Sequence, residues 1–122
     1  MQKRGNAVLV LFSLLLSATW AAAQTVTIPT VLHHPDQYDG KVISIIGTIA
    51  AYKESVAGRA GEYTMFRLED GGSSVTVYYI GKHLGLKNGV RVRVIGTYSA
   101  FKQMGQFTYR NQLGAQEVQV LP

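Results

Sequence analysis

The chain has 122 residues, which is enough for one small domain with a single hydrophobic core. It contains no cysteine, and this excludes disulfides, thiol catalysis and lipid attachment through a cysteine. The formal net charge of +5 permits an anionic partner but does not require one.

The first 23 residues have the pattern of a secretory signal peptide. Lys3 and Arg4 supply the positive start, residues 7–16 are almost entirely apolar, and residues 21–23 are the small alanines that signal peptidase needs. An uncleaved membrane anchor is the weaker alternative, because the apolar run is shorter than the roughly 20 residues of a membrane span. We expect cleavage after Ala23 and a periplasmic or secreted mature protein.

The remaining 99 residues carry ten basic and seven acidic residues, a formal charge of +3. No later segment is apolar enough to span a membrane, so we expect none after cleavage of the signal peptide. We divide the mature chain into residues 24–39, a lead with a short helix, and residues 40–122, the body of the domain.

The lead predicts a short helix, and a long strand follows it. Pro29 suits the first turn of a helix, and Pro35 ends the helix after about two turns. The stretch 39–53 then begins with a turn signal and continues with β-branched residues. Gly47 in its middle predicts a bend that lets one strand serve two halves of a barrel. The face with Ile43, Ile45 and Ile49 is expected in the core.

Residues 62–69 and 73–80 predict a hairpin. Both runs alternate between apolar and polar residues, and Asp70-Gly71-Gly72 between them is a strong turn signal. The side chains expected to face inward are Thr64, Phe66, Leu68, Val75 and Val77. Those expected to face outward are Tyr63, Met65, Arg67, Thr76 and Tyr78.

The rest of the chain predicts a connector and two more strands. Residues 81–88 have room for one helical turn, from which Leu84 and Leu86 would close an end of the barrel. Residues 90–98 alternate clearly and form a strand with Arg91 and Arg93 on its outer face, where they favour solubility. We expect residues 99–105 to be a loop, and residues 106–111 and 116–121 to be one interrupted strand.

This pattern resembles the five-stranded OB-fold barrel of tRNA anticodon-binding and helicase-associated domains. The resemblance covers residues 40–121 and implies an all-β Greek-key barrel, with a short N-terminal helix and a short helical connector between strands three and four. The lead before Gly40 resembles that of small exported bacterial OB-fold proteins. The matching segments are Gly40-Lys41-Val42-Ile43, Gly47-Thr48-Ile49, Phe66-x-Leu68-x-Asp70-Gly71, Val75-x-Val77, Gly89-Val90-x-Val92-x-Val94-x-Gly96 and Val118-x-Val120-Leu121.

The resemblance also implies a binding face on strands one to three, framed by the first and fourth loops between strands. Tyrosines there would stack on bases and cations would follow phosphates, so we expect single-stranded nucleic acid or another anionic polymer, bound with strong salt dependence. In the alternative interpretation the tyrosines merely cover a pleated surface. The residues expected on the face are Tyr52, Lys53, Arg59, Tyr63, Met65, Arg67, Thr76, Tyr78 and Lys102.

A second functional interpretation is a periplasmic protein-interaction or envelope-stress module without a role in nucleic-acid binding. A partner chain would pair with a free strand edge beside Arg91 or Gln119. The sequence does not indicate the oligomeric state.

We expect neither catalysis nor a cofactor. The carboxylates are scattered, and no GxSxG, P-loop or GxGxxG pattern occurs. His33 and His34 are adjacent, so on a helix they point about 100° apart and do not easily bind one ion, and His83 is isolated. We therefore predict a binding protein without a metal site.

Overall fold

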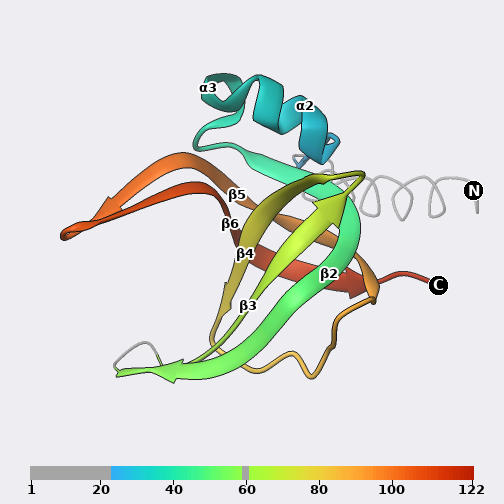
Figure 1. Cartoon of the computed structure of the whole chain (residues 1–122), viewed down its shortest axis with the longest axis vertical. Helices are drawn as coiled ribbons and strands as arrows, with labels where there is room; N and C mark the ends of the chain where they lie inside the picture. Colours follow the sequence, from blue (N-terminus) through green and yellow to red (C-terminus); the bar gives the residue numbers. More distant parts are fainter. Residues whose placement is uncertain (1–22, 59–60) are drawn as a thin grey trace, which may run out of the picture.

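The computed structural model describes residues 23–58 and 61–122. In these residues five long strands form a closed ring in the order β2-β3-β4-β6-β5, because β2 also pairs with β5 (Figure 1). The predicted all-β barrel is confirmed. The elements are β1 (Gln24–Thr25), α2 (Ile28–His33), α3 (Pro35–Tyr38), β2 (Val42–Ala57), β3 (Gly61–Asp70), β4 (Ser73–Ile80), β5 (Arg91–Met104) and β6 (Phe107–Val120).

Strand β2 serves both halves of the barrel, as predicted. Residues 42–48 pair with β5, and residues from Thr48 onward pair with β3. The change of partner follows Gly47, where the two strands lie too close for a side chain. A Cβ atom at Gly47 would lie 2.7 Å from the backbone oxygen of Glu69 and 2.8 Å from Cγ of Leu68.

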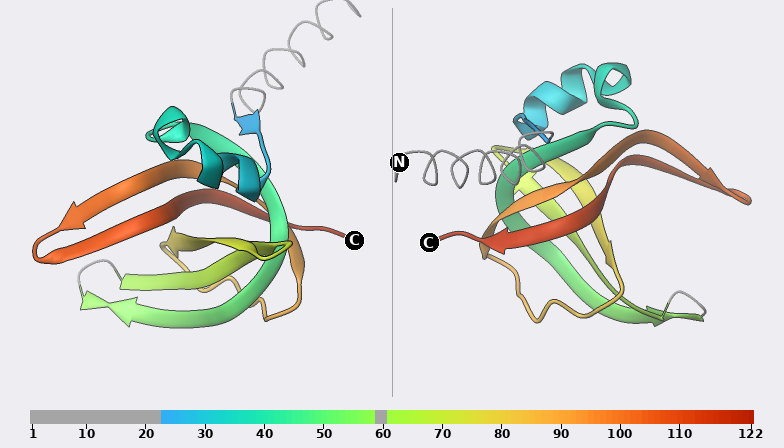
Figure 2. Two further views of the ribbon diagram at one scale, coloured as in Figure 1. Left: turned by 45° about the horizontal axis from the view of Figure 1, so that its top comes forward. Right: turned by 180° about the vertical axis from the view of Figure 1, so that it is seen from behind.

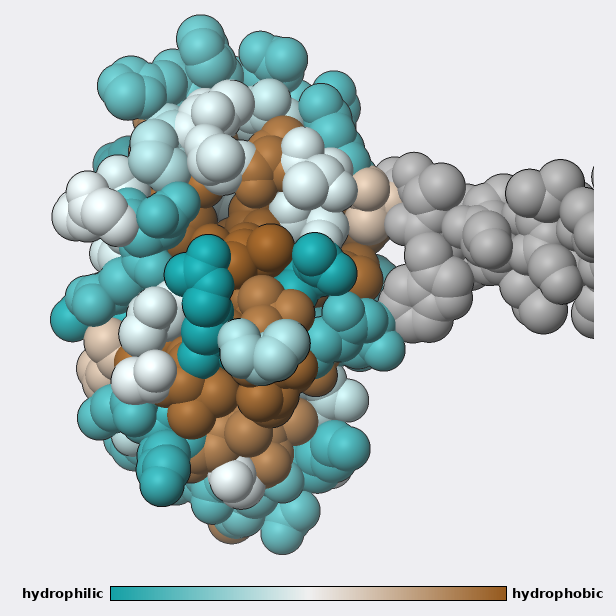
Figure 3. All heavy atoms as spheres, turned by 90° about the vertical axis from the view of Figure 1, so that its right-hand side faces the viewer, coloured by the Kyte–Doolittle hydropathy of each residue, from teal (hydrophilic) through white to brown (hydrophobic). Residues whose placement is uncertain are grey.

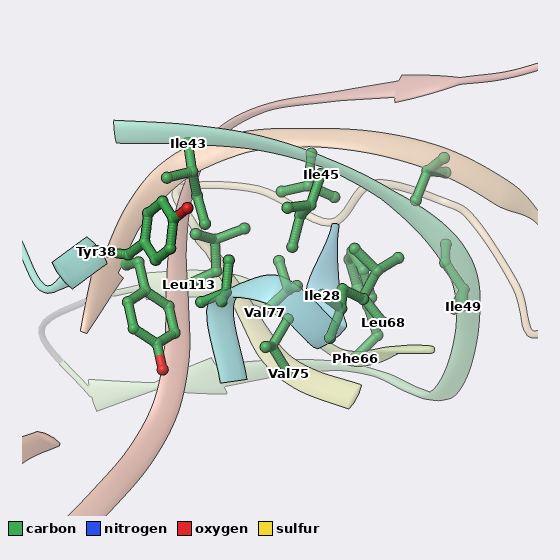
Figure 4. Packing of buried hydrophobic residues seen from close by; sticks show 14 residues of the cluster. Ile28, Tyr38, Ile43, Ile45, Ile49, Phe66, Leu68, Val75, Val77 and Leu113 are labelled. Atoms are coloured by element: carbon green, nitrogen blue, oxygen red, sulfur yellow. The ribbon is translucent and has the colours of Figure 1, made fainter. Parts of the chain in front are cut away.

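The core is formed by alternate residues of the strands and by the N-terminal helix. Ile43, Ile45 and Ile49 of β2 are buried in one cluster with Phe66 and Leu68 of β3 (Figure 4). This confirms the predicted inward face, to which Thr64, Val75 and Val77 also belong.

Helix α2 closes one end of the barrel, as Figure 1 shows. Thr27 caps the helix by accepting a hydrogen bond from the backbone N–H of Thr30, and Pro29 lies in the first turn. Ile28 and Val31 are fully buried in the core. The predicted N-terminal helix is therefore confirmed, with the short α3 added after it.

The connector between β4 and β5 contains no helix, although every one of its residues 81–90 is described. The predicted helical turn is wrong. Gly81, Gly85 and Gly89 all have positive φ angles, which a right-handed helix does not accommodate. The connector therefore crosses the other end of the barrel as an irregular segment with a turn at its end.

Side chains of the barrel bind the connector's backbone N–H groups. The N–H of Leu84 donates to Thr64 Oγ1, and that of Gly85 donates to the Glu54 carboxylate. Leu84 and Leu86 pack against the core, so their predicted role at the barrel end is confirmed without a helix.

Two hairpins extend beyond the barrel on the same side, opposite the C-terminus (Figures 1 and 2). The β2–β3 arm consists of residues 52–58 and 61–64, and the β5–β6 arm of residues 99–112. The loop expected at residues 99–105 is wrong, because β5 continues to Met104 and pairs with β6. The predicted break in the last strand is also wrong, because β6 runs through Gly114.

Cross-strand pairs stabilise the β5–β6 arm where a loop was expected. Phe101 lies opposite Arg110, whose guanidinium carbon is 5.5 Å from the centre of the Phe101 ring. The Tyr98 hydroxyl donates to Asn111 at the base of the arm. These contacts involve residues far enough apart in sequence that local turn signals did not reveal them.

No helix in the described residues has the length and hydrophobicity needed to cross a membrane. The predicted signal peptide falls on residues 1–22, outside the described residues, apart from its last alanine.

We predict that Gly47→Ala lowers the free energy of unfolding by about 1–3 kcal/mol, because the added methyl group forces β2 away from β3. The control is Gly114→Ala, since a Cβ there lies 3.9 Å from its nearest neighbour, the Thr97 backbone oxygen. Urea unfolding monitored by circular dichroism gives both values. Equal destabilisation by the two substitutions would contradict the proposed close contact.

Candidate functional site

A groove of about 590 Å³ lies between the outer face of β3 and β4 and the base of the β5–β6 arm. Its lining is mainly aromatic and small polar side chains, with a single charged residue. The lining residues are Tyr63, Tyr78, Ile80, Thr97, Ser99, Lys102, Tyr109, Gln112, Gly114 and Ala115.

The register of β3 and β4 brings two tyrosines together on the groove side. Tyr63 lies opposite Ile80, and Met65 lies opposite Tyr78, so the tyrosines are diagonal neighbours on one face. Their ring centres are 6.4 Å apart and the ring planes differ by 37°. Together they form a continuous aromatic surface.

A third tyrosine comes from the β5–β6 arm, where Tyr109 lies opposite Lys102. The pKa of Tyr78 is raised, first by burial and then by the neighbouring hydroxyls of Tyr109 and Tyr63, while a hydrogen bond with Gln112 lowers it. Tyr78 is therefore neutral at physiological pH and does not repel an anionic ligand.

Of the nine residues predicted for the site, three line this groove: Tyr63, Tyr78 and Lys102. Lys53, Met65 and Tyr78 form one row across β2, β3 and β4, because each lies opposite the next. Arg67 and Thr76 form the neighbouring row, which ends at Gln112 of β6. The structure thus places Lys53, Met65, Arg67 and Thr76 on the face beside the groove, outside its lining.

The charge of Arg67 is already paired. Its guanidinium lies 2.8 Å from the Glu69 carboxylate, two residues along the same strand. Among the predicted residues that the structure places on this face, Lys53 is the other cation besides Arg67, and it is exposed. Arg59, also predicted for the site, falls outside the described residues.

Tyr52 does not reach the binding face, and this part of the prediction is wrong. A bulge in β2 shifts the register between Ala50 and Lys53, with Ala51 at a φ of 51°, so the expected alternation is reset. The Tyr52 ring stacks on Phe66, with 6.2 Å between centres. Its hydroxyl donates to Glu54 and accepts from the N–H of Leu86, and burial raises its pKa.

Sequence reasoning missed Tyr109, Ile80 and Gln112. Tyr109 was assigned to a strand, but the expected loop at residues 99–105 left it without a partner strand. Aromatic residues alternate at positions 107 and 109, and residues 99–104 could form the strand that pairs with them. This alternation was the signal in the sequence for a longer hairpin.

The predicted strand edge beside Arg91 is wrong, because Arg91 lies opposite Thr48 of β2 while its carbonyl accepts from Leu121 on the other side. Gln119 lies opposite Arg93, and β4 pairs with β6 only at residues 112–114. The edge of β6 that faces away from β5 therefore has no partner strand at Gln119 among the described residues.

Hydrophobic side chains are also exposed on the side of the barrel opposite the arms, where Figure 3 shows a band of them between hydrophilic residues. Val120, near the C-terminus, is 57% exposed. We assign no ligand to this side. Among residues 23–58 and 61–122, no group of three or more histidine or acidic residues has an arrangement that could hold a metal ion.

No protein-family model matches the sequence, and no curated protein matches it either. Several solved structures are similar. Yeast Stn1 and Ten1 superpose with a TM-score of 0.63 at 13% identity, covering 82% of this chain and 63% of that one. The telomere capping protein Ten1 from Saccharomyces pombe gives 0.54 at 18% identity, covering 80% of each chain.

A putative aspartyl-tRNA synthetase from Leishmania major Friedlin gives a TM-score of 0.59 at 14% identity, over 81% of this chain. This chain has an OB fold. At such identities the likeness extends to the fold alone. The chain spans 63% of the Stn1 and Ten1 match and 21% of the synthetase, so the activities of those whole proteins do not transfer to it.

We predict that Tyr52→Phe destabilises the protein by about 1 kcal/mol, because it leaves the N–H of Leu86 without its acceptor and removes one of the two hydrogen bonds that a Glu54 oxygen accepts. Tyr63→Phe is the matched control, since this hydroxyl lies at the groove and makes no hydrogen bond with the described residues. Urea midpoints of the two variants test the difference. A midpoint for Tyr52→Phe equal to that of the wild type would mean that the hydroxyl does not anchor the connector.

Proposed function

We propose that the protein is a binding module for single-stranded nucleic acid, held in the groove by stacking of bases on tyrosines. The observation that carries this proposal is the convergence of Tyr63, Tyr78 and Tyr109 from three different strands on one groove. Every base has a π-face, so such a surface accepts many sequences. We propose binding, with no catalytic role.

The size of the groove suits a short segment of the polymer. Its volume of about 590 Å³ falls within the usual range of small-molecule pockets, so it holds about one or two nucleotides. Gln112 adds an amide that can donate to and accept from the edge of a base.

The charges favour stacking over phosphate binding. Lys102 is the one cation among the lining residues, Lys53 lies on the adjacent face, and the Arg67 charge is paired with Glu69. With about two phosphate contacts, the slope of log K against log salt is about −1.4 for a single strand. This replaces the strong salt dependence that we expected from the sequence.

The names of the similar structures support the proposal by analogy. One is a telomere capping protein and another is an aspartyl-tRNA synthetase, and both names refer to nucleic acids. The analogy rests on fold, so the tyrosine groove of this chain carries the argument.

We predict that Tyr63→Ala, Tyr78→Ala and Tyr109→Ala each weaken binding of a fluorescent single-stranded oligonucleotide by about 1–3 kcal/mol, measured by anisotropy. Phe107→Ala is the control, because this aromatic residue is 59% exposed on the same arm but outside the groove.

Heparin, an anionic polymer without bases, serves as the second ligand. Equal affinity for heparin, unaffected by the tyrosine substitutions, would favour an anionic polymer held by charge. Absence of oligonucleotide binding at low salt would contradict the proposed function.

A protein-interaction module is the second candidate. Phe101 and Phe107 on the β5–β6 arm are 52% and 59% exposed, and exposed aromatic side chains are enriched in protein interfaces. Phe107→Ala separates the candidates, because it would weaken a protein contact on the arm without removing a residue that lines the tyrosine groove.

We also propose that the protein is exported and cleaved after Ala23. The start of the first strand supports this cleavage position, since β1 begins at Gln24, which pairs with Ile43 of β2. The mature chain would then begin directly at an element of the fold.

We predict that the full chain, expressed in a bacterium with a periplasm, yields a mature form starting at Gln24 in the periplasmic fraction, as measured by intact-mass spectrometry. Ala23→Leu should block processing, because the residue before the cut must be small. Recovery of the wild-type chain in the cytoplasm at its full mass would contradict export.

A further inference from the structure

The β5–β6 arm presents two large hydrophobic side chains to solvent. Phe101 is 52% exposed and Phe107 is 59% exposed. Both lie on a hairpin that extends beyond the barrel, on the side opposite the C-terminus (Figures 1 and 2). A protruding hairpin of this kind can contact a flat surface that the barrel itself does not reach.

The two rings lie on opposite faces of the hairpin. Residues that lie opposite each other on paired strands share a face, and so do alternate residues of one strand. Phe101 therefore shares a face with Arg110, and Phe107 shares the other face with Lys102. A hairpin laid flat on a surface would bury only one ring. Contact through the turn at residues 105–106 brings both rings to the surface.

Positive charge accompanies the rings. Residues 99–112 contain Lys102 and Arg110 but no aspartate or glutamate. The guanidinium carbon of Arg110 is 5.5 Å from the centre of the Phe101 ring, so charge and apolar surface are presented together. By contrast, residues 52–64, which include the β2–β3 arm, have two basic and two acidic residues. The excess of positive charge therefore belongs to the β5–β6 arm.

This combination matches the chemistry of an anionic lipid surface. Protein segments that lie in a membrane interface combine apolar side chains, which enter the boundary of the acyl chains, with lysine and arginine, which bind anionic head groups. The arm strands pair with each other up to the turn, so many backbone groups at the tip are already hydrogen-bonded. A protein partner would have to surround the hairpin to cover both rings, whereas a lipid surface surrounds a tip that enters it.

We propose that the β5–β6 arm is a membrane-surface anchor, which inserts its tip, with Phe107 and Phe101, into the head-group region of a bilayer that contains anionic lipids. Arg110 and Lys102 contact the head groups. The attachment is shallow and reversible, because two rings and two charges bury far less apolar area than a membrane-spanning helix. Lys102 also lines the tyrosine groove, so the groove opens near the membrane whatever ligand it binds.

Tryptophan fluorescence tests the anchor directly. The single tryptophan of the sequence is Trp20, so residues 24–122 contain none. This part of the chain has every strand and every core residue of the described barrel, and it can be studied without the N-terminal segment. We expect the emission of Phe107→Trp to shift to shorter wavelength with vesicles that contain phosphatidylglycerol, and not with vesicles of phosphatidylcholine alone.

Val120→Trp is the matched control, because Val120 is 57% exposed but lies at the end of β6 near the C-terminus, away from the arms (Figure 1). Its emission should not change. A shift at Val120→Trp in place of Phe107→Trp would mean that the opposite apolar side meets the lipid, and the anchor would be overturned. Absence of any vesicle binding would also overturn it and would favour a protein partner for the arm.

Co-sedimentation with the phosphatidylglycerol vesicles measures what each side chain contributes. Phe107→Ala and Arg110→Gln should each weaken the partition coefficient about 5-fold. Phe107→Ala leaves the lining of the tyrosine groove complete, so oligonucleotide binding should persist in it. Loss of vesicle binding is thereby distinguished from failure of the proposed nucleic-acid function. If both variants sediment like the wild type, the arm is not the anchor.

Discussion

The close packing of β2 against β3 at Gly47 is the constraint on which the rest of the barrel depends. Because no side chain fits between Gly47 and the backbone of Glu69, β2 can leave β5 and join β3 within one residue. That exchange closes the ring. It also directs the second half of β2 outward into the β2–β3 arm, next to the outer face of β3 and β4 that supplies one side of the groove.

The connector shows how the barrel end is stabilised without a helix. The backbone N–H groups of the connector donate to Thr64, Glu54 and the Tyr52 hydroxyl. Side chains at this end of the barrel therefore also anchor the connector that crosses it. A residue that looks like part of a binding surface, Tyr52, is therefore part of this support. The bulge at Ala51 causes the change, since it reverses the faces of the following residues.

Local patterns in the sequence were sufficient to predict the barrel, but they were not sufficient to predict the two arms. The inward faces of β2, β3 and β4 follow from alternation, and the bend follows from Gly47, both of which are readable over a few residues. The length of the β5–β6 arm depends on pairs such as Phe101 with Arg110, which only the folded hairpin brings together. The groove was consequently predicted in part: Tyr63, Tyr78 and Lys102 were expected at the site, and Tyr109 was not.

The arm also changes what kind of ligand the site favours. On the barrel alone, Tyr63 and Tyr78 would form an open surface with Lys53 and Arg67 around it, an arrangement suited to following phosphates. Tyr109 and Gln112 convert that surface into a groove, and Glu69 neutralises Arg67. In the proposed function, the energy of binding comes mainly from stacking of a flat base between tyrosines, to which the single lysine of the lining adds orientation.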